Sequence, residues 1–362
     1  MIKVLVAGDF CPLQDRNLLE NWILDQQIFQ DHDIRILNLE GPLTDNHNPI
    51  LKIGPNLRID PCWASVIAAS GFNVVTLANN HILDMGEKGL IETIHHCDQS
   101  GIGHVGAGKN ISDARKPLIM DMNGARIGFL AFTENEFSIA SEACAGAAPI
   151  DPVANYYSIK EIREKLDYLI LICHGGNELF KFPRPGMISL SRYYSDIGAD
   201  AIIWHHSHVP CGYEIYNGTH IFYGTGNFYF PHKKHTFSDW YTGYLVSLEL
   251  QKNKISSRII PYKFDLQKIS FLAGTELSNF TSDLEHLCDE LLDTHKLQRR
   301  WKDHCYEKRK YYISTLIANS RCEKLLFRLD VLKEKYYAKK LRFLRNLIEC
   351  ESHRELLLEL LR

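Results

Sequence analysis

The sequence predicts an α/β (α+β) fold followed by an all-helical C-terminal region. Over the first 265 residues, short apolar runs of strand length alternate with amphipathic stretches of helical spacing. Several of these runs end directly in Asp, Glu, Asn or His, where α/β folds usually place their chemistry. From Glu276 onward, leucines recur at helical spacing with almost no Gly or Pro between them. We therefore expect one domain over residues 1–265 and a helical appendage over residues 275–362.

The same patterns place the individual elements in chain order. The expected strands are residues 2–7, a run starting at 34, 71–77, 125–132, 168–173, 201–204, 243–250 and 254–262. A hairpin is expected at residues 215–221 because Asn217 and Gly218 form a turn signal. The expected helices lie near residues 17–29, 61–70, 87–100 and 159–166 and within 183–197. Residues 101–108 are expected to form a Gly-rich connection and residues 138–151 a loop.

The charges are unevenly distributed along the chain. Of 362 residues, 45% are hydrophobic and 23% charged, as in soluble globular proteins, and the net charge is only −3. From Lys296 to the end, however, there are 18 Lys and Arg against 9 Asp and Glu, and the rest carries 23 against 35. This asymmetry marks the C-terminal part as a separate, basic module. Its basic faces are either solvated or contact an anionic polymer, a membrane surface or an acidic protein partner.

The cysteines and the N-terminal residues favour a cytoplasmic protein. The ten cysteines lie far apart and form no CxxC pair, which fits a reducing compartment better than a disulfide scaffold. The first residues enter a strand at once and meet Asp9, so they are too short for a signal peptide. No apolar run approaches the roughly 18 residues that a membrane span needs.

The densest group of candidate ligands follows the apolar run at residues 201–204. His205, His206 and His208 come directly after it. On an extended backbone, residues two apart point the same way, so His206 and His208 could converge on one ion. Imidazole suits zinc, iron, copper and nickel. The alternative is that one histidine caps a core and the others are solvated.

Other strand ends carry further polar groups. Asp9 is placed either to ligate a metal or to cap the next helix. Asn38 and Glu40 share a face, so Glu40 can ligate while Asn38 supports it or ligates too.

The cluster after the strand at 71–77 has two interpretations. Asn80 and His81 side by side could give one metal ligand and one transition-state donor, with Asp84 holding the His81 tautomer. Alternatively, Asn79 and Asn80 only make turn contacts. His174 ends another strand and is followed by two glycines, which allow close approach of substrate.

Together, these stretches resemble the CapA family, also called the poly-γ-glutamate capsule synthesis (PGA_cap) family. The resemblance covers about residues 1 to 262 and rests on the order and spacing of its motifs. The matching motifs are Gly8-Asp9, 38–44, 77–86, 174–178, 198–200, 205–209 and 224–228.

The CapA family is in turn similar to calcineurin-like metallophosphoesterases, which implies a four-layer αββα sandwich with metal ligands on its strand-end loops. By this resemblance the metal ligands would be Asp9, Glu40, Asn80, His174, His206 and His208.

The sequence departs from the pattern in three respects. The metallophosphoesterase Asp-x-His is Asp9-Phe10-Cys11 here, which would leave one metal site weak or absent. The bridging Asp is replaced by Glu40, as is usual in the capsule family. Trp204 and Ser207 stand where the family has Gly and Pro, which would narrow the pocket.

The expected function is metal-dependent hydrolysis or transfer on a phosphoester or an anionic polymer, either poly-γ-glutamate or capsule polysaccharide. One or two Mn, Fe or Zn ions would bind, and His81 would donate to the leaving group while Asp84 orients it. The expected substrate-binding residues are Asn38, Asn79, Glu178, His205 and Asn227. The rival hypothesis is a non-catalytic accessory component that binds polymer and docks a protein partner through its basic helices. No nucleic-acid-binding motif is present, so no nucleic-acid partner is expected.

Overall fold

In the computed structural model, the chain divides into two compact units, Met1–Leu297 and Gln298–Arg362. The structure describes residues 1–13, 27–231, 238–252, 254–265 and 268–361. The division falls later than the boundary between residues 265 and 275 that the sequence suggested. The reason is α7 (Gly274–Leu292), whose Leu284 is buried in the core of the first unit.

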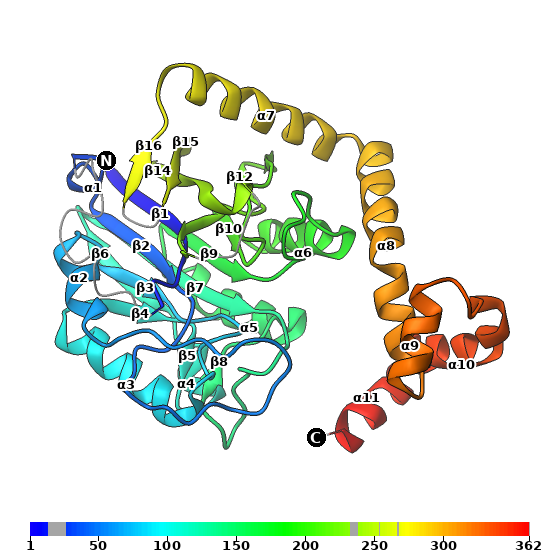
Figure 1. Cartoon of the computed structure of the whole chain (residues 1–362). Coiled ribbons are helices and arrows are strands. Elements are labelled where there is room, and N and C mark those ends of the chain that lie inside the picture. Colours follow the sequence, from blue (N-terminus) through cyan, green and yellow to red (C-terminus); the bar gives the residue numbers. More distant parts are fainter. Residues whose placement is uncertain (14–26, 232–237, 253, 266–267, 362) are drawn as a thin grey trace. The chain divides into compact units, whose positions relative to one another are not determined.

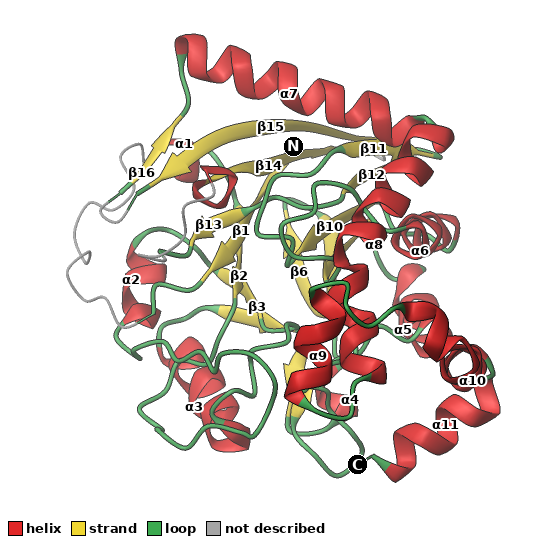
Figure 2. Ribbon diagram, turned by 45° about the vertical axis from the view of Figure 1, so that its right-hand side comes forward, coloured by secondary structure: helices red, strands yellow, loops and turns green. Residues whose placement is uncertain are grey.

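The first unit contains two large sheets (Figures 1 and 2). Within the described residues, the first sheet has eight strands in the order β16-β15-β14-β1-β2-β3-β4, and β13 also pairs with β1. β1 to β4 are parallel, whereas β14 to β16 are antiparallel to their neighbours. Its strands are β1 Ile2–Phe10, β2 Ile34–Leu39, β3 Val74–Thr76, β4 Gly103–Val105, β13 Asn227–Tyr229, β14 Thr242–Gln251, β15 Lys254–Phe264 and β16 Ile269–Phe271.

The second sheet has six strands among the described residues, in the order β11-β12-β10-β9-β7-β6. Its central strands β7, β9, β10 and β12 are parallel, and the two edge strands are antiparallel. These strands are β6 Leu118–Met122, β7 Ala125–Thr133, β9 Tyr168–His174, β10 Ala201–His205, β11 Tyr213–Tyr216 and β12 Thr219–Phe222. A separate small sheet pairs β5 Ala107–Gly108 with β8 Gly146–Ala147.

The two large sheets face each other and are covered by helices on their outer sides, which gives the αββα layering that the family resemblance implies (Figure 2). One apolar cluster, with Val4 and Ile36 from the first sheet and Ile170 and Ile203 from the second, fills the space between them. A second cluster packs α2 and α3 on the first sheet, and a third packs α5 and α6 on the second. Besides α7, the described helices of the first unit are α1 Gln27–Gln30, α2 Trp63–Ala69, α3 Gly86–Gln99, α4 Ile111–Ala114, α5 Pro152–Arg163, α6 Pro185–Asp196 and η1 Ser238–Tyr241.

The second unit is helical, as the leucine spacing predicts. Its elements are α8 Thr294–Ile317, which begins just before the division between the units, α9 Arg321–Arg328, η2 Glu334–Tyr337, α10 Ala338–Glu349 and α11 Glu351–Leu360. In the part of the chain that the structure describes, no helix combines the length and apolarity needed to cross a membrane.

Several local expectations need correction. α5 begins at Pro152 rather than 159, because the Asp151 side chain accepts hydrogen bonds from the first backbone N–H groups of the helix. The 101–108 connection contains β4 and β5, and the 138–151 loop contains β8. These strands, like β6, β13 and β16, are too short or too polar to give an apolar run. Most of the helix expected at 17–29 lies outside the described residues.

Candidate metal centre

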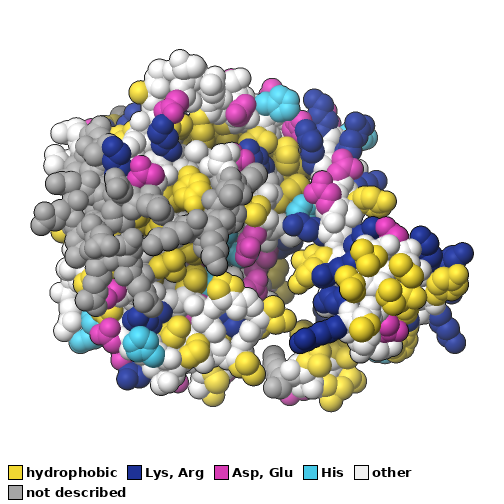
Figure 3. Space-filling model, in the orientation of Figure 1, with side chains coloured by type: hydrophobic (Ala, Val, Ile, Leu, Met, Phe, Trp, Pro, Cys, Tyr) yellow, Lys and Arg dark blue, Asp and Glu magenta, His cyan; other side chains and the backbone are white. Residues whose placement is uncertain are grey.

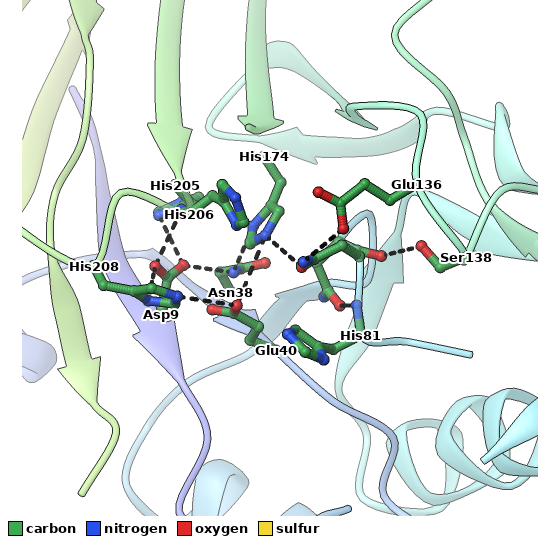
Figure 4. Close-up of polar contacts among 12 residues, drawn as sticks. Asp9, Asn38, Glu40, His81, Glu136, Ser138, His174, His205, His206 and His208 are labelled. Carbon is green, nitrogen blue, oxygen red and sulfur yellow. Dashed lines mark hydrogen bonds and ion pairs between the residues drawn. The ribbon is translucent and has the colours of Figure 1, made fainter. Parts of the chain in front are cut away.

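The polar groups predicted at the strand ends meet at one edge of the sandwich (Figure 4). Asp9 lies near the end of β1, Asn38 near the end of β2, and His174 and His205 end β9 and β10. Parallel strands in each sheet present their carboxyl ends on the same side, so loops from both sheets converge there. The side chains of Asp9, Asn38, Glu40, Asn80, His81, His174, His205, His206 and His208 are all buried.

Glu40 is the carboxylate shared by two possible ligand groups. One consists of Glu40, His174 and His206, and the other of Asp9, Glu40 and His208; in each, the ligand atoms lie within 4.8 Å of one another. A further group combines the exposed Glu178 with His206 and His208. The site therefore brings carboxylate oxygens and imidazole nitrogens into the range that one or two transition ions require.

Neither carboxylate oxygen of Glu40 has a hydrogen-bond partner among the described residues, although both are buried. Burial and the neighbouring Asp9 raise the pKa of the Glu40 carboxyl well above its usual range. Ionised Glu40 would have His208 Nε2 at 3.7 Å and His174 Nε2 at 3.8 Å but no hydrogen bond, so its charged form is costly, and a divalent cation is a group that would offset this cost. The donor set at Glu40 therefore fits a bound metal ion.

Asp9 is bonded quite differently from Glu40. Its Oδ1 accepts from Asn38 Nδ2 at 2.7 Å, and its Oδ2 accepts from the backbone N–H of His206 at 3.1 Å and lies 3.3 Å from His208 Nδ1. Burial raises the pKa of Asp9, but the hydrogen bond from His208 and the nearby histidines outweigh it, so the net shift is downward. Asp9 thus ties β1 to the loop that carries the histidines.

His174 links the two sheets through Asn80. Its Nε2 lies 3.0 Å from Asn80 Oδ1 and 3.8 Å from Glu40 Oε1. Burial and the neighbouring His206 lower the pKa of His174 well below its usual range, so its ring is neutral and has a lone pair to offer. Asn80 Oδ1 therefore lies beside the ligand group formed by Glu40, His174 and His206.

His206 and His208 converge as predicted, but not for the expected reason. Both follow the end of β10 and have positive φ angles, 89° and 56°, instead of an extended backbone. Such angles are uncommon for residues other than Gly and are often found at functional sites. The turn places the two rings 5.8 Å apart and leaves the His206 ring 4.8 Å from that of His174.

His208 is held by Asn227 and by two aromatic residues that the sequence did not single out. Its ring packs against Trp240 at 4.8 Å and Phe230 at 5.5 Å, and its Nδ1 lies 2.9 Å from Asn227 Oδ1. Burial alone lowers the pKa of His208, but Glu40 and Asp9 outweigh this and raise the pKa to about 10. No sequence pattern pointed to Trp240 or Phe230, which act through packing.

Most residues expected to bind substrate make their bonds within the protein. Asn38 bonds to Asp9, and Asn79 donates to the Leu39 carbonyl and accepts from the His81 backbone N–H. Asn227 donates to the backbone carbonyls of His208 and Trp240. His205 Nδ1 lies 3.1 Å from Thr225 Oγ1, and its buried Nε2 has no partner among the described residues. Glu178 alone of these five is exposed.

Besides Glu40, three residues depart from the family pattern, and they behave differently. Cys11 is buried in the apolar cluster on the outer face of the first sheet and belongs to none of the ligand groups formed by described residues. Trp204 is buried in the apolar cluster between the second sheet and α6, where its Nε1 donates to Ser191 Oγ at 2.9 Å. Because its side chain lies in this cluster and not among the polar site residues, the expectation that it narrows the pocket is wrong. Ser207 is buried and donates to the Val209 carbonyl.

His81 and Asp84 form the predicted pair, together with a third residue. His81 Nδ1 lies 2.6 Å from Asp84 Oδ2, and Lys52 Nζ lies 2.5 Å from Asp84 Oδ1 and 3.1 Å from His81 Nδ1. Asp84 Oδ1 forms an ion pair with Lys52, and the ionised Asp84 Oδ2 can only accept from His81 Nδ1, so the tautomer that fits carries its proton on Nδ1 and its lone pair on Nε2. The Lys52 side chain is only 3% exposed. It lies in a polar loop, where nothing in the sequence suggested burial.

Replacing Lys52 with Met is expected to lower the free energy of unfolding by about 3 kcal/mol, because Asp84 would remain buried without its cation. Urea unfolding of the metal-free protein measures this. The matched control is Lys116→Met, which breaks an exposed pair with Asp113 and should change stability little. Adding Asp84→Asn to the Lys52 variant should restore part of the loss. Equal effects of the Lys52 and Lys116 changes would contradict the buried-pair interpretation.

Comparison with known proteins identifies the family. A sequence model described as "Bacterial capsule synthesis protein PGA_cap" matches residues 20–232. The chain is 34% identical over 210 residues to "PGA biosynthesis protein CapA" of Bacillus subtilis (strain 168), covering 57% of this chain and 55% of that protein. It is 31% identical over 202 residues to "Capsule biosynthesis protein CapA" of Bacillus anthracis, covering 53% and 49%. The chain thus spans about half the length of the curated relatives it matches.

Two solved structures are also similar. A hypothetical protein from Thermus thermophilus has a TM-score of 0.48 at 15% identity, covering 75% of this chain and 100% of that chain. The 5'-nucleotidase from Candida albicans has a TM-score of 0.43 at 13% identity, covering 85% and 58%. The family model matches more than half of the residues, across the motifs that build the polar cluster from Asn38 to His208. On this evidence, the chain belongs to the bacterial capsule synthesis PGA_cap family.

Proposed function

We propose that the chain is a metal-dependent hydrolase or transferase of capsule or polymer biosynthesis. Its substrate would be an anionic polymer, poly-γ-glutamate or capsule polysaccharide, or a phosphoester. The observation that carries the proposal is Glu40, a buried carboxylate that faces His174 and His208 and has no hydrogen-bond donor among the described residues. The polymer substrates are proposed because two relatives are named for PGA and capsule biosynthesis.

The proposed ligands form two unequal sets. Glu40, Asn80, His174 and His206 supply four donors, whereas Asp9, Glu40 and His208 supply three. Cys11 stands where a fourth ligand would be expected for the second set, and Asp9 already accepts bonds from protein donors. One Mn, Fe or Zn ion is therefore proposed for the first set, with weaker binding at the second. A bound ion of this kind lowers the pKa of a coordinated water towards neutrality and stabilises an oxyanion.

The chain's own residues would supply the remaining chemistry. His81, held by Asp84 through Nδ1, would take up a proton on Nε2 and pass it to the leaving group. Glu178 is exposed at the rim formed with His206 and His208, and would position the substrate. The proposed substrate site also includes Asn38, Asn79, His205 and Asn227. Their hydrogen bonds within the protein would also help to hold the metal ligands in place.

Two measurements on the same preparation test this function. Protein purified without chelator should contain close to one transition ion per chain by elemental analysis. With added Mn²⁺, it should hydrolyse members of a panel that contains phosphomonoesters, phosphodiesters and poly-γ-glutamate. The double variant His206→Ala, His208→Ala should lose both the ion and the activity. An ion-free preparation, or a rate unchanged in the double variant, would contradict the proposal.

A non-catalytic accessory role is the second candidate. Cys11 in place of a ligand histidine, outside the ligand groups of the described residues, is the observation that favours it. In that case the sandwich would bind polymer and the basic helices would dock a protein partner. Polymer binding that persists in the double histidine variant, without turnover on any substrate, would support this candidate. A cytoplasmic location is proposed for either role, because the ten cysteines lie far apart along the chain and form no CxxC pair, which fits a reducing compartment.

A further inference from the structure

The loop that follows β9 is tied to the histidine loop that follows the neighbouring strand β10. The Leu179 backbone N–H donates to the Ser207 carbonyl at 2.9 Å. Ser207 lies between His206 and His208 in the sequence, so this bond holds the backbone beside Glu178 next to both histidines. The main chain therefore sets the position of Glu178 against them, although its side chain is exposed.

Both loops have backbone conformations that are unusual for their residues. Leu179 has a φ angle of 60°, and those of His206 and His208 are 89° and 56°. The left-handed region is uncommon for residues other than Gly, especially for bulky ones. The Leu179 side chain is also 40% exposed, so its burial does not account for this conformation. Such strain is kept mainly where it positions functional groups, which here are the side chains of Glu178 and the two histidines.

The Glu178 carboxylate forms a ligand group with His206 and His208, in which the three ligand atoms lie within 4.8 Å of one another. Figure 3 shows several Asp and Glu side chains scattered over the surface of the first unit, so an exposed carboxylate alone indicates nothing. Glu178 differs because two buried histidines lie beside it, and the buried Nδ1 of His206 has no hydrogen-bond partner among the described residues. A buried polar atom without a partner points to a group that binds there, such as a metal ion.

The proposed second ligand set, Asp9, Glu40 and His208, contains one donor fewer than the first. A transition ion normally binds about four donors, so this set leaves room for a further ligand. Cys11 does not supply it, because it is buried in the apolar cluster on the outer face of the first sheet and belongs to no ligand group of the described residues. Glu178 approaches His208 from the loop after β9, in the second sheet, and is the candidate for the missing donor.

We propose that Glu178 is a ligand of a second, more weakly bound metal ion, which it holds together with Asp9, Glu40 and His208. This inference rests on the proposed function and gives Glu178 a defined way to position the substrate. A free carboxylate at the rim would repel the anionic substrates proposed above. As a ligand, Glu178 would lose this effect because the cation would offset its charge. Glu178 would thus help to position an anionic substrate through the ion that it holds.

Glu136 is a matched carboxylate at the same site. It is also exposed, and its Oε2 accepts from Asn80 Nδ2 at 3.1 Å (Figure 4). It belongs to no ligand group formed by described residues. Replacing either Glu178 or Glu136 with Gln removes one negative charge from the site, but only the Glu178 change removes a proposed ligand. The two variants therefore separate metal ligation from a general effect of charge.

Titration of the full-length chain with Mn²⁺, with free ions counted by electron paramagnetic resonance, tests the inference. The unmodified protein should have one tight and one weaker Mn²⁺ site. Glu178→Gln should weaken the second site by at least about tenfold and keep the first ion in elemental analysis. Glu136→Gln should keep both sites. Glu178→His, which supplies a nitrogen donor instead, should bind the second ion more tightly than Glu178→Gln does.

Several results would overturn the inference while leaving the proposed function in place. These are a single Mn²⁺ site in the unmodified protein, a second site that is equally tight in Glu178→Gln, and equal weakening in Glu178→Gln and Glu136→Gln. Loss of the first ion from Glu178→Gln would also overturn it, because Glu178 would then support the whole site. Because Glu178 is exposed, its variants should unfold at the same temperature as the unmodified metal-free protein. No bound ion at all in the unmodified protein would contradict the proposed function itself, and this inference with it.

Discussion

Replacing Glu40 with Gln is expected to abolish tight metal binding while leaving the metal-free protein at least as stable as the unmodified one. Hydrogen-bond partners of metal ligands already contribute about 10- to 100-fold to metal affinity, so loss of the carboxylate shared by both ligand groups should exceed ~100-fold. In the metal-free protein, the buried Glu40 oxygens accept no hydrogen bond among the described residues, and burial with Asp9 nearby raises the Glu40 pKa, so a neutral amide of the same size should cost no stability. Calorimetric titration with Mn²⁺ and thermal unfolding with and without the ion measure the two effects.

The matched control is Glu214→Gln in the second sheet. Glu214 is also buried, but it pairs with Arg192 and accepts from Tyr223, so its replacement should lower stability without changing metal content. The two variants should therefore show opposite behaviour. If Glu40→Gln destabilised the metal-free protein as much as Glu214→Gln and kept the ion, Glu40 would be a structural carboxylate rather than a ligand.

Much of the fold could be predicted because parallel strands have a simple sequence pattern. The central strands β1, β2, β9 and β10 are mostly apolar runs, interrupted only by Lys3 and Arg35 before their polar ends, and are buried on both faces, so their position stands out. Their polar C-terminal ends follow directly, which is why the cluster from Asp9 to His208 could be collected from the sequence. The layering was implied only by the family resemblance. Edge strands such as β6 and β16 were missed because few of their residues are buried.

The contacts that the sequence could not predict depend on loops and on approach between distant residues. In the sequence, Lys52 is a charged residue in a polar loop. Only the folded chain brings it into contact with Asp84, which follows β3. Trp240 carries no motif, yet it packs on His208 because η1 returns to the site. His206 and His208 lie near each other, as their two-residue spacing suggested. Their positive φ angles show, however, that the backbone there is not extended, as that argument had assumed. Periodicity describes segments, whereas these contacts arise from tertiary packing.

Replacing His81 with Gln is expected to lower the hydrolytic rate by about 10²- to 10⁴-fold, the usual contribution of a positioned proton donor. Gln retains polarity and similar size but cannot transfer a proton, and His81 belongs to no ligand group formed by described residues, so the metal content should stay unchanged. Asp84→Asn should lower the rate less, because the His81 ring remains but loses the partner that fixes its tautomer.

His95→Gln on α3 is the matched exposed control and should have no effect. Steady-state kinetics with elemental analysis on each variant measures both quantities. A loss of metal in His81→Gln would mean that His81 supports the site instead of donating the proton, and equal rates in His81→Gln and His95→Gln would remove it from the mechanism.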